Sequence, residues 1–434
     1  MNSRTVVIGF SGVSLPLRDM PFVCEWSASG LRAGLTFPPA ISSVAAWTSI
    51  VTGLSPAQHG IFDFYRRQSP GSQQLRVLAS RDISCETIWA ALDRQGLKAT
   101  VLNYPMTFPA PKIEGQVLPG SWVSAKRLKL GCYPSDLYGE LGALDGVDLN
   151  ELTAEPLLRM LVYLMENKPS DLSVLLVRDK GLLDFAAIDR HLEHVIQAAG
   201  PDATVLLISE PAVDGKKFST NTWLAEHGYL AWMASSNPGT VDGKVLETAD
   251  LNRQAALIDW TKTQAWCPPA GGNGLFIVRQ DATHPAGLRD DEYEGFRTRL
   301  MEELPSSDVI SRVWKQEELC AGPFQELAPD LMIEWSGGAE GILLGRGPAM
   351  KRGMPLTRMP LSSIAPILLY TLGLQMPGDL EGCIPAEILD PAWVESHPVL
   401  VAASGSNREA DKPLIEPKDE EEILRRLRGL GYLE

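Results

Sequence analysis

Short runs of apolar and β-branched residues recur along the chain and alternate with amphipathic segments. Apolar side chains fill consecutive positions in these runs, which is typical of strands buried on both faces of a mostly parallel sheet. We predict strands at residues 5–10, 99–104, 172–177, 203–209, 274–279 and 330–335. We predict helices at residues 86–96, 182–200 and 292–304. The alternation indicates a doubly wound α/β fold, in which functional residues gather at the carboxyl ends of the strands.

The chain is expected to form one main domain over residues 1–402. Two stretches interrupt the alternation, at about 106–160 and 214–265, and we expect them to cap the crevice at the strand ends, because long insertions in compact domains are commonly functional. Residues 403–434 are predicted to be a polar linker followed by a short helix of mixed charge. Such a tail can dock on its own domain or on a second subunit, which would give a homo-oligomer.

Composition excludes several classes of function. The 39 Lys and Arg against 54 Asp and Glu give a net charge of −15, which opposes nucleic acid as a partner, because phosphate binding needs clustered cations. No apolar stretch approaches the roughly 18–20 residues that cross a bilayer, and the N-terminus has no signal-like core, so we expect a cytoplasmic protein without a membrane partner. The 6 cysteines are scattered singly, which favours neither a disulfide framework nor a thiolate metal site.

The most informative stretch is residues 38–67, where a Pro-rich loop leads into a predicted helix that ends at Gly53. Ser43 stands at the start of this helix. A hydroxyl there lies in the positive field of free backbone N–H groups, which suits an oxyanion. The residues alone leave a second interpretation open, namely that Ser42 or Ser43 only caps the helix.

Residues 46–67, AWTSIVTGLSPAQHGIFDFYRR, closely resemble the type I phosphodiesterase and nucleotide pyrophosphatase branch of the alkaline phosphatase superfamily. Further similar segments follow in the order of that family: IGFSG near the N-terminus, NYPMTFPAP, NTWLAEHGYL, IDWTKTQAW, APDLMIEW and the terminal RLRGLGYLE. The resemblance covers nearly the whole chain. It implies an alkaline-phosphatase-like sheet flanked by helices, and a mechanism in which two divalent ions activate a Thr or Ser nucleophile.

The same resemblance implies that most of the metal ligands are replaced. Ser11, in IGFSG, stands where the family has an aspartate, whereas Ser43, four residues before Trp47, keeps the hydroxyl of the nucleophile. His59 belongs to a Gln-His-Gly-Ile turn that the family carries outside its metal set, so it is expected to be structural.

The later ligand positions depart further from the family pattern. Asp179 keeps a carboxylate, but Leu183 replaces the histidine four residues on. Glu210 and Pro211 replace an Asp-His pair, and Gly337 replaces the last histidine. Zinc needs several nitrogen or sulfur donors, so we predict that there is no metal cofactor. A single Mg²⁺ or Ca²⁺ on Asp179 and Glu210 stays open, since those ions accept oxygen ligands.

Our leading hypothesis is a degenerate family member that binds a small molecule or a partner protein in the family pocket instead of hydrolysing phosphoesters. The candidate catalytic residues are Ser43, Asp179 and Glu210, and the candidate ligand-binding residues are Ser11, Trp47, Asn103 and Trp122. Two alternatives remain: a metal-independent acyl- or group-transfer enzyme using Ser43 with Asp179 or Glu210 as base, and a weak phosphodiester or sulfate-ester hydrolase with one hard cation.

Overall fold

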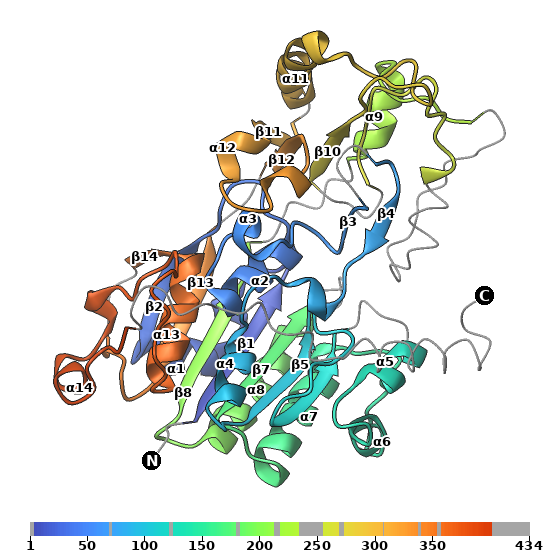
Figure 1. Cartoon of the computed structure of the whole chain (residues 1–434). Helices are drawn as coiled ribbons and strands as arrows, with labels where there is room; N and C mark the ends of the chain where they lie inside the picture. Colours follow the sequence, from blue (N-terminus) through green and yellow to red (C-terminus); the bar gives the residue numbers. More distant parts are fainter. Residues whose placement is uncertain are drawn as a thin grey trace.

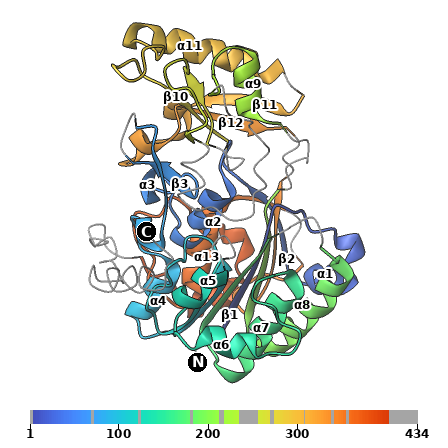
Figure 2. The same ribbon diagram turned by 90° about the vertical axis from the view of Figure 1, so that its right-hand side faces the viewer.

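The computed structural model of the chain describes residues 4–68, 72–120, 125–178, 183–211, 218–233, 255–268, 273–306, 308–336, 340–353 and 357–401. A large sheet with helices on both faces forms one part of the molecule, and a smaller sheet with its own helices lies above it (Figure 1). The same two parts stand one above the other after a 90° turn (Figure 2). The carboxyl ends of the central strands of the large sheet point toward the smaller part.

The large sheet is 8-stranded and runs in the order β14-β2-β13-β8-β1-β7-β5-β6. Its strands are β1 (Thr5–Ser11), β2 (Leu31–Thr36), β5 (Ala99–Tyr104), β6 (Gly115–Pro119), β7 (Leu172–Arg178), β8 (Thr204–Ser209), β13 (Gly341–Arg346) and β14 (Thr357–Pro360). Among these strands only β13 is antiparallel to its neighbours, β2 and β8. Strand β1 lies between β7 and β8 and is buried at every position, as expected for the centre of a doubly wound sheet.

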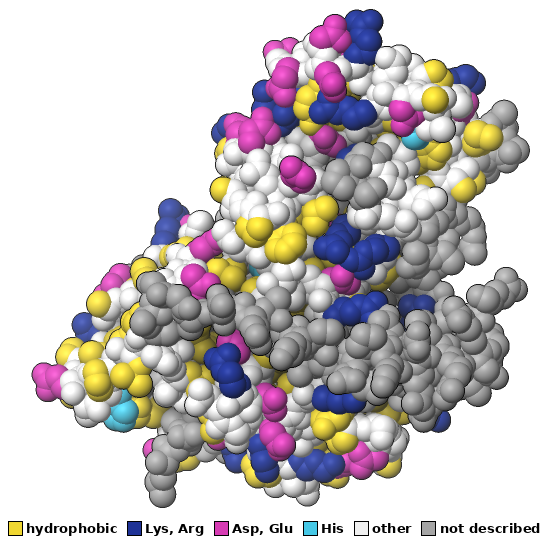
Figure 3. Space-filling model, viewed as in Figure 1, with side chains coloured by type: hydrophobic (Ala, Val, Ile, Leu, Met, Phe, Trp, Pro, Cys, Tyr) yellow, Lys and Arg dark blue, Asp and Glu magenta, His cyan; other side chains and the backbone are white. Residues whose placement is uncertain are grey.

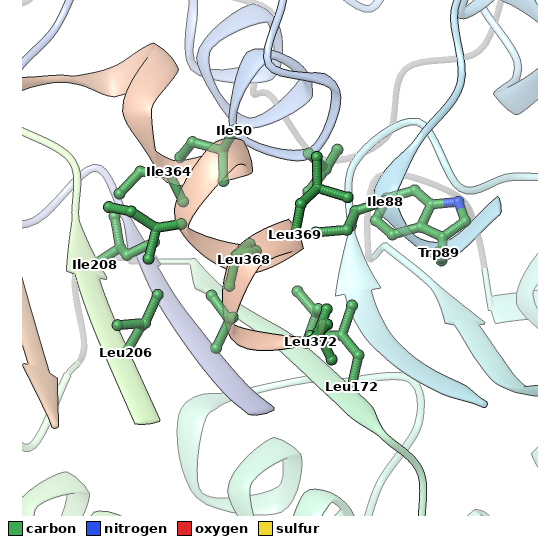
Figure 4. Close-up of a cluster of buried hydrophobic side chains, with 14 of the residues drawn as sticks. Ile50, Ile88, Trp89, Leu172, Leu206, Ile208, Ile364, Leu368, Leu369 and Leu372 are labelled. Atoms are coloured by element: carbon green, nitrogen blue, oxygen red, sulfur yellow. The ribbon is translucent and has the colours of Figure 1, made fainter. Parts of the chain in front are cut away.

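Helices cover both faces of this sheet. Helices α1 (Pro21–Ala28), α7 (Ala154–Asn167) and α8 (Phe185–Ala199) share one apolar cluster with the strands, and α2 (Ser43–Thr52), α4 (Ile88–Arg94) and α13 (Ile364–Thr371) share the cluster on the other face. Part of this second cluster is drawn in Figure 4, where Leu368 and Leu369 lie between Leu206, Ile208 and Leu172 on the sheet side and Ile50, Ile88 and Trp89 on the helix side. Helix α13 is buried all round, which explains its nearly uniform apolar sequence.

The smaller sheet is 4-stranded and antiparallel, in the order β11-β12-β10-β9. Its strands are β9 (Ala265–Trp266), β10 (Gly274–Ile277), β11 (Ile310–Lys315) and β12 (Leu331–Trp335), and its helices are α9 (Thr220–Glu226) and α11 (Asp290–Glu303). The hairpin of β3 (Tyr65–Arg67) and β4 (Leu75–Val77) contributes Tyr65 and Leu75 to the core of this part. The hairpin therefore joins the smaller part to the segment that follows α2.

The remaining elements are short. They are the helices α3 (Pro56–His59), α5 (Ala125–Gly131), α6 (Leu137–Gly142), α12 (Gln316–Leu319) and α14 (Pro391–Ser396), and the 3-10 helices Leu17–Asp19, Ser80–Asp82, Leu304–Ser306, Gln325–Leu327, Leu361–Ser363 and Ala386–Ile388. None of the helices in the described ranges is both long enough and apolar enough to cross a membrane.

The α/β class with a mostly parallel sheet is confirmed, and the predicted strands at 5–10, 99–104, 172–177 and 203–209 are β1, β5, β7 and β8. The runs at 274–279 and 330–335 were wrongly assigned to this sheet, because they form β10 and β12 of the antiparallel sheet. The physical reason is that β10 is fully buried in a separate core. A continuous apolar run therefore indicates burial on both faces without indicating the direction of its neighbours.

The two interrupting stretches have different places in the fold. Within 106–160, β6 extends the edge of the large sheet, and α7 begins to cover its face. Within 214–265, α9 packs in the smaller part. Their role as a cap stays a prediction. The predicted tail at 403–434 lies outside the described residues.

Candidate functional site

Three elements meet at the carboxyl edge of the large sheet. Ser11 is the last residue of β1, Glu210 follows the last residue of β8, and Ser43 is the first residue of α2. The backbone N–H of Glu210 donates to the carbonyl oxygen of Phe10 at 2.9 Å, which extends the pairing of the two strands by one residue. Parallel strands end at the same edge of a sheet, so residues far apart in sequence come together there.

One carboxylate oxygen accepts hydrogen bonds from three side chains at this edge. Glu210 Oε2 accepts from Ser43 Oγ at 2.8 Å, from Ser11 Oγ at 2.9 Å and from the indole Nε1 of Trp47 at 3.0 Å. The two serine oxygens also lie 2.8 Å apart. Each hydroxyl has one proton, so both can donate to Glu210, or one can donate to the other. We call Ser11, Ser43, Trp47 and Glu210 the Glu210 cluster.

The start of α2 explains why the Ser43 hydroxyl is available to this cluster. Ser42 is the N-cap, and its side chain accepts from the backbone N–H of Ala45 at 3.3 Å and donates to the carbonyl of Phe62. Capping thus belongs to Ser42, which leaves Ser43 Oγ to donate to Glu210. The helix ends at Gly53, whose positive φ of 70° places it in the left-handed region.

Trp47 follows Ser43 by one helical turn, so both side chains lie on the same face of α2. The Trp47 side chain is buried, and its ring meets that of Tyr104 edge-on at 6.1 Å between centroids. The Tyr104 hydroxyl donates to the Trp47 carbonyl at 2.8 Å. The indole N–H is therefore held in its direction toward Glu210 by packing.

Arg178 brings a positive charge to the same edge, and the sequence reasoning missed it. It is the last residue of β7 and pairs in register with Ser11. Desolvation lowers the pKa of the Arg178 guanidinium, and the charge of Glu210 opposes that change. An acidic and a basic residue thus flank Ser11 at the ends of adjacent strands. The sequence signal for Arg178 was its position at the end of a predicted strand, directly before Asp179.

The other candidates are placed differently. Asn103 is buried in the left-handed region at φ 53°, and its Nδ2 donates to the Leu176 carbonyl at 2.7 Å, so this donor is engaged by the backbone. Asp179, Trp122 and Gly337 lie outside the described residues. Of the residues that replace family histidines, Leu183 packs at the margin of the apolar cluster under α8, and Pro211 is partly exposed.

Over the described part of the chain, no three His, Cys, Asp or Glu side chains gather as a metal centre would require. His59 is buried, and desolvation lowers its pKa to about 3. Its Nδ1 accepts from the Ile61 N–H at 3.1 Å, so the neutral ring carries its proton on Nε2, which lies 3.1 Å from Ser49 Oγ. This neutral ring fixes the turn after α3 against α2.

Comparison with known proteins gives one family match and several structural neighbours. The family model for type I phosphodiesterase / nucleotide pyrophosphatase matches residues 6–340. No curated protein matches the chain. An inactive variant of murine ectonucleotide pyrophosphatase / phosphodiesterase 5, in complex with AMP, is similar over 89% of this chain and 100% of its own, with 10% identity and a TM-score of 0.56. Phosphonoacetate hydrolase from Sinorhizobium meliloti 1021, in complex with phosphonoformate, is similar over 86% of this chain and 95% of its own, with 14% identity and a TM-score of 0.55. At these identities the structural likeness establishes the fold alone.

Proposed function

The chain belongs to the type I phosphodiesterase / nucleotide pyrophosphatase family, and from that premise we propose that it uses the strand-end site of the family to bind a ligand without two-metal phosphoester hydrolysis. The observation that carries the proposal is the convergence of three donors, from Ser11, Ser43 and Trp47, on Glu210 Oε2. The ligand would be a small molecule or a segment of a partner protein.

The chemistry of these groups fits a metal pair poorly. A pair of divalent ions needs several carboxylate or imidazole ligands, whereas the three partners of Glu210 Oε2 are two hydroxyls and an indole. The indole of Trp47 is a donor only and cannot bind a metal. Ser11 offers a neutral hydroxyl at the end of the central strand, where a carboxylate would help to neutralise two dications. These features support a site without a metal pair.

The energetics of phosphoester hydrolysis also support a site without a metal pair. Enzymes that hydrolyse phosphate esters lower the barrier by as much as roughly 20 kcal/mol or more. In a two-metal site the ions supply both the charge neutralisation and the activated nucleophile. Here the group beside Ser43 Oγ is the Glu210 carboxylate, at 2.8 Å, and its negative charge opposes the approach of a phosphoryl group. Arg178, at the end of β7, brings one positive charge to the same edge, which is less than the charge of two dications.

Purified protein assayed with a nitrophenyl phosphodiester, with and without added Zn²⁺ or Mn²⁺, tests this proposal. We expect no metal-dependent turnover and no two equivalents of metal by elemental analysis. Robust metal-dependent turnover that Ser43→Ala abolishes would overturn it. Ser42→Ala is a matched control, because Ser42 is the helix cap and has no hydrogen bond to Glu210 among the described contacts.

A metal-independent enzyme is the second candidate, and one contact favours it. Ser43 Oγ donates to Glu210 Oε2 at 2.8 Å, which is the geometry of a nucleophile and its general base. A broad serine-reactive probe followed by peptide mass spectrometry tests this candidate. A covalent adduct on Ser43 that disappears in Glu210→Gln supports it, and an unlabelled Ser43 rejects it.

The third candidate, a weak phosphodiester or sulfate-ester hydrolase with one hard cation, would need Asp179 together with Glu210. Asp179 lies outside the described residues, so the candidate depends on the sequence alone. One tightly held equivalent of Mg²⁺ or Ca²⁺, lost in Asp179→Asn, would support it. The cytoplasmic location and a homo-oligomer formed through residues 403–434 stay proposals from the sequence, which cell fractionation and light scattering would test.

A further inference from the structure

The β3–β4 hairpin places two arginines directly opposite each other. Arg66 on β3 pairs in register with Arg76 on β4. Side chains opposite each other in an antiparallel pair have Cβ atoms about 4.5–5.5 Å apart, and like charges in this arrangement destabilise the pair. A cross-strand arginine pair therefore needs an anion close by.

Asp82 supplies one anion to both arginines. Arg76 donates to both of its carboxylate oxygens, from Nη1 at 3.1 Å and from Nη2 at 2.5 Å. The Arg66 Nη2 lies 3.6 Å from Oδ1, and the Ala79 N–H donates to Oδ2 at 2.7 Å. Burial alone would raise the pKa of Asp82, but these hydrogen bonds and charges outweigh burial and lower it. Asp82 is therefore ionised at neutral pH and shared between two cations.

The charges around Asp82 do not balance. In the described residues, Arg66 and Arg76 share the same acidic partner, Asp82. Two positive charges therefore face one negative charge. Desolvation and the charge of Arg76 lower the pKa of Arg66, and Asp82 opposes this only in part. The Asp82 side chain is 8% exposed, whereas those of Arg66 and Arg76 are 22% and 32% exposed. The arginines are therefore more accessible to a solute than Asp82 is.

The residues that flank the hairpin pack against the helix that carries Ser43, and among the described contacts neither arginine touches the Glu210 cluster. Phe64 and Leu78, which flank the hairpin, pack in the same apolar cluster as Val44, the residue after Ser43. In Figure 3, Lys and Arg side chains gather near the middle of the face, where Figure 1 places the hairpin.

We propose that Arg66 and Arg76 form a binding site for a tetrahedral oxyanion, a phosphoryl or sulfate group, which supplies the second negative charge that Asp82 alone does not provide. Each guanidinium has five N–H donors in a rigid fork, and Asp82 takes only some of them. The fork geometry matches phosphoryl oxygens and forms charge-assisted hydrogen bonds with them. This site does not depend on the chemistry of Glu210, and it goes beyond the function proposed above.

Isothermal titration of the full-length protein with inorganic phosphate at low ionic strength tests the proposal, and sulfate in a second arm distinguishes the two kinds of oxyanion. We expect saturable binding that Arg66→Gln weakens about ten-fold or more, because a hydrogen bond to a charged group contributes about 1.5–3 kcal/mol. Arg66→Lys, which keeps the charge but loses the fork, should give intermediate affinity.

The matched control is Arg312→Gln. Arg312 lies on β11 of the smaller sheet, with its guanidinium 3.6 Å from the Trp314 ring centroid, and its loss changes the net charge by the same amount. This variant should bind phosphate as the unaltered protein does. If the unaltered protein shows no saturable binding of either anion, or if Arg66→Gln with unchanged circular dichroism binds as tightly, the site does not exist. Equal losses in Arg66→Gln and Arg312→Gln would show a general charge effect and would also reject it.

Discussion

The hydroxyl oxygens of Ser11 and Ser43 lie 2.8 Å apart, although the two residues are 32 positions apart in the sequence. Both hydroxyls also donate toward the same oxygen of Glu210. Ser11 is neutral, so the Glu210 carboxylate is the one negative charge among these three side chains. A second carboxylate at position 11 would change the balance, because two carboxylates in contact cannot both be ionised without a cation between them.

Ser11→Asp is therefore expected to make the folded protein depend on divalent cations. In the presence of EDTA the free energy of unfolding should fall by about 1–3 kcal/mol, because the new carboxylate is placed beside Glu210 in a buried position. Millimolar Mg²⁺ or Mn²⁺ should restore it. Thermal unfolding with and without the metal measures the effect, and Ser11→Asn, of the same size but uncharged, should not respond. Equal responses of the two variants would contradict this role of position 11.

Glu210→Gln should destabilise the protein even though it keeps the shape of the side chain. Three hydrogen bonds to a charged oxygen become bonds to a neutral amide, and an amide NH₂ placed toward Ser43 or Trp47 would face donors. We expect a loss of about 1–3 kcal/mol in urea unfolding. Glu302→Gln, on the exposed face of α11, is the control and should change little. A variant as stable as the parent would mean that these contacts contribute little.

The edge of the sheet could be predicted from the sequence, but the contacts there could not. The apolar runs predicted β1 and β8. The resemblance to the family indicated that Ser11 lies at the end of β1 and that Glu210 follows β8. That the Trp47 indole donates to Glu210 depends on its orientation against Tyr104, which is a tertiary contact. Periodicity carries no information about such contacts.

The register of the β3–β4 hairpin could not be predicted from the sequence either. The residues FYRR and LRV are visible, but whether Arg66 stands opposite Arg76 depends on the length and path of the loop between them. For the same reason the sequence showed that 274–279 is a buried strand without showing that it pairs antiparallel with β12. Long-range pairing is decided by packing that a local pattern does not encode.

Asp63→Asn should change the pH dependence of stability. Burial raises the pKa of Asp63 from 3.8 to about 6, and hydrogen bonds from Phe64 and Tyr65 oppose the rise only in part. Between these pH values the folded state binds more protons than the unfolded state, so the free energy of unfolding falls as pH rises and stays lowered above about pH 6. The Asn side chain does not ionise, so the free energy of unfolding of the variant does not fall in this way. It should match the parent near pH 4 and exceed it by about 2–3 kcal/mol at pH 7.

His59 has the opposite effect in the parent protein. Desolvation keeps it neutral in the fold down to about pH 3, against an ordinary pKa of 6.5. The unfolded state therefore binds more protons across that range, and the free energy of unfolding rises with pH. Asp63 and His59 offset each other between about pH 4 and 6, so Asp63→Asn should show the upward slope due to His59. Urea midpoints at several pH values measure this, and parallel curves for parent and variant would refute the shifted pKa of Asp63.

Thiol reactivity should separate Cys383 from the other cysteines. Cys383 is exposed and Cys24 is partly buried, with its Sγ 3.9 Å from the Arg32 Nη2, whereas Cys85, Cys132, Cys267 and Cys320 are buried. Burial raises the pKa of Cys132 and Cys320 to about 11 and that of Cys267 to about 12, and only thiolates react with disulfide reagents. We expect native protein to show one fast thiol with a chromogenic disulfide, and all 6 after denaturation. Cys383→Ser should remove the fast phase, with Cys267→Ser leaving it intact; a fast phase that survives Cys383→Ser would place the reactive thiol elsewhere.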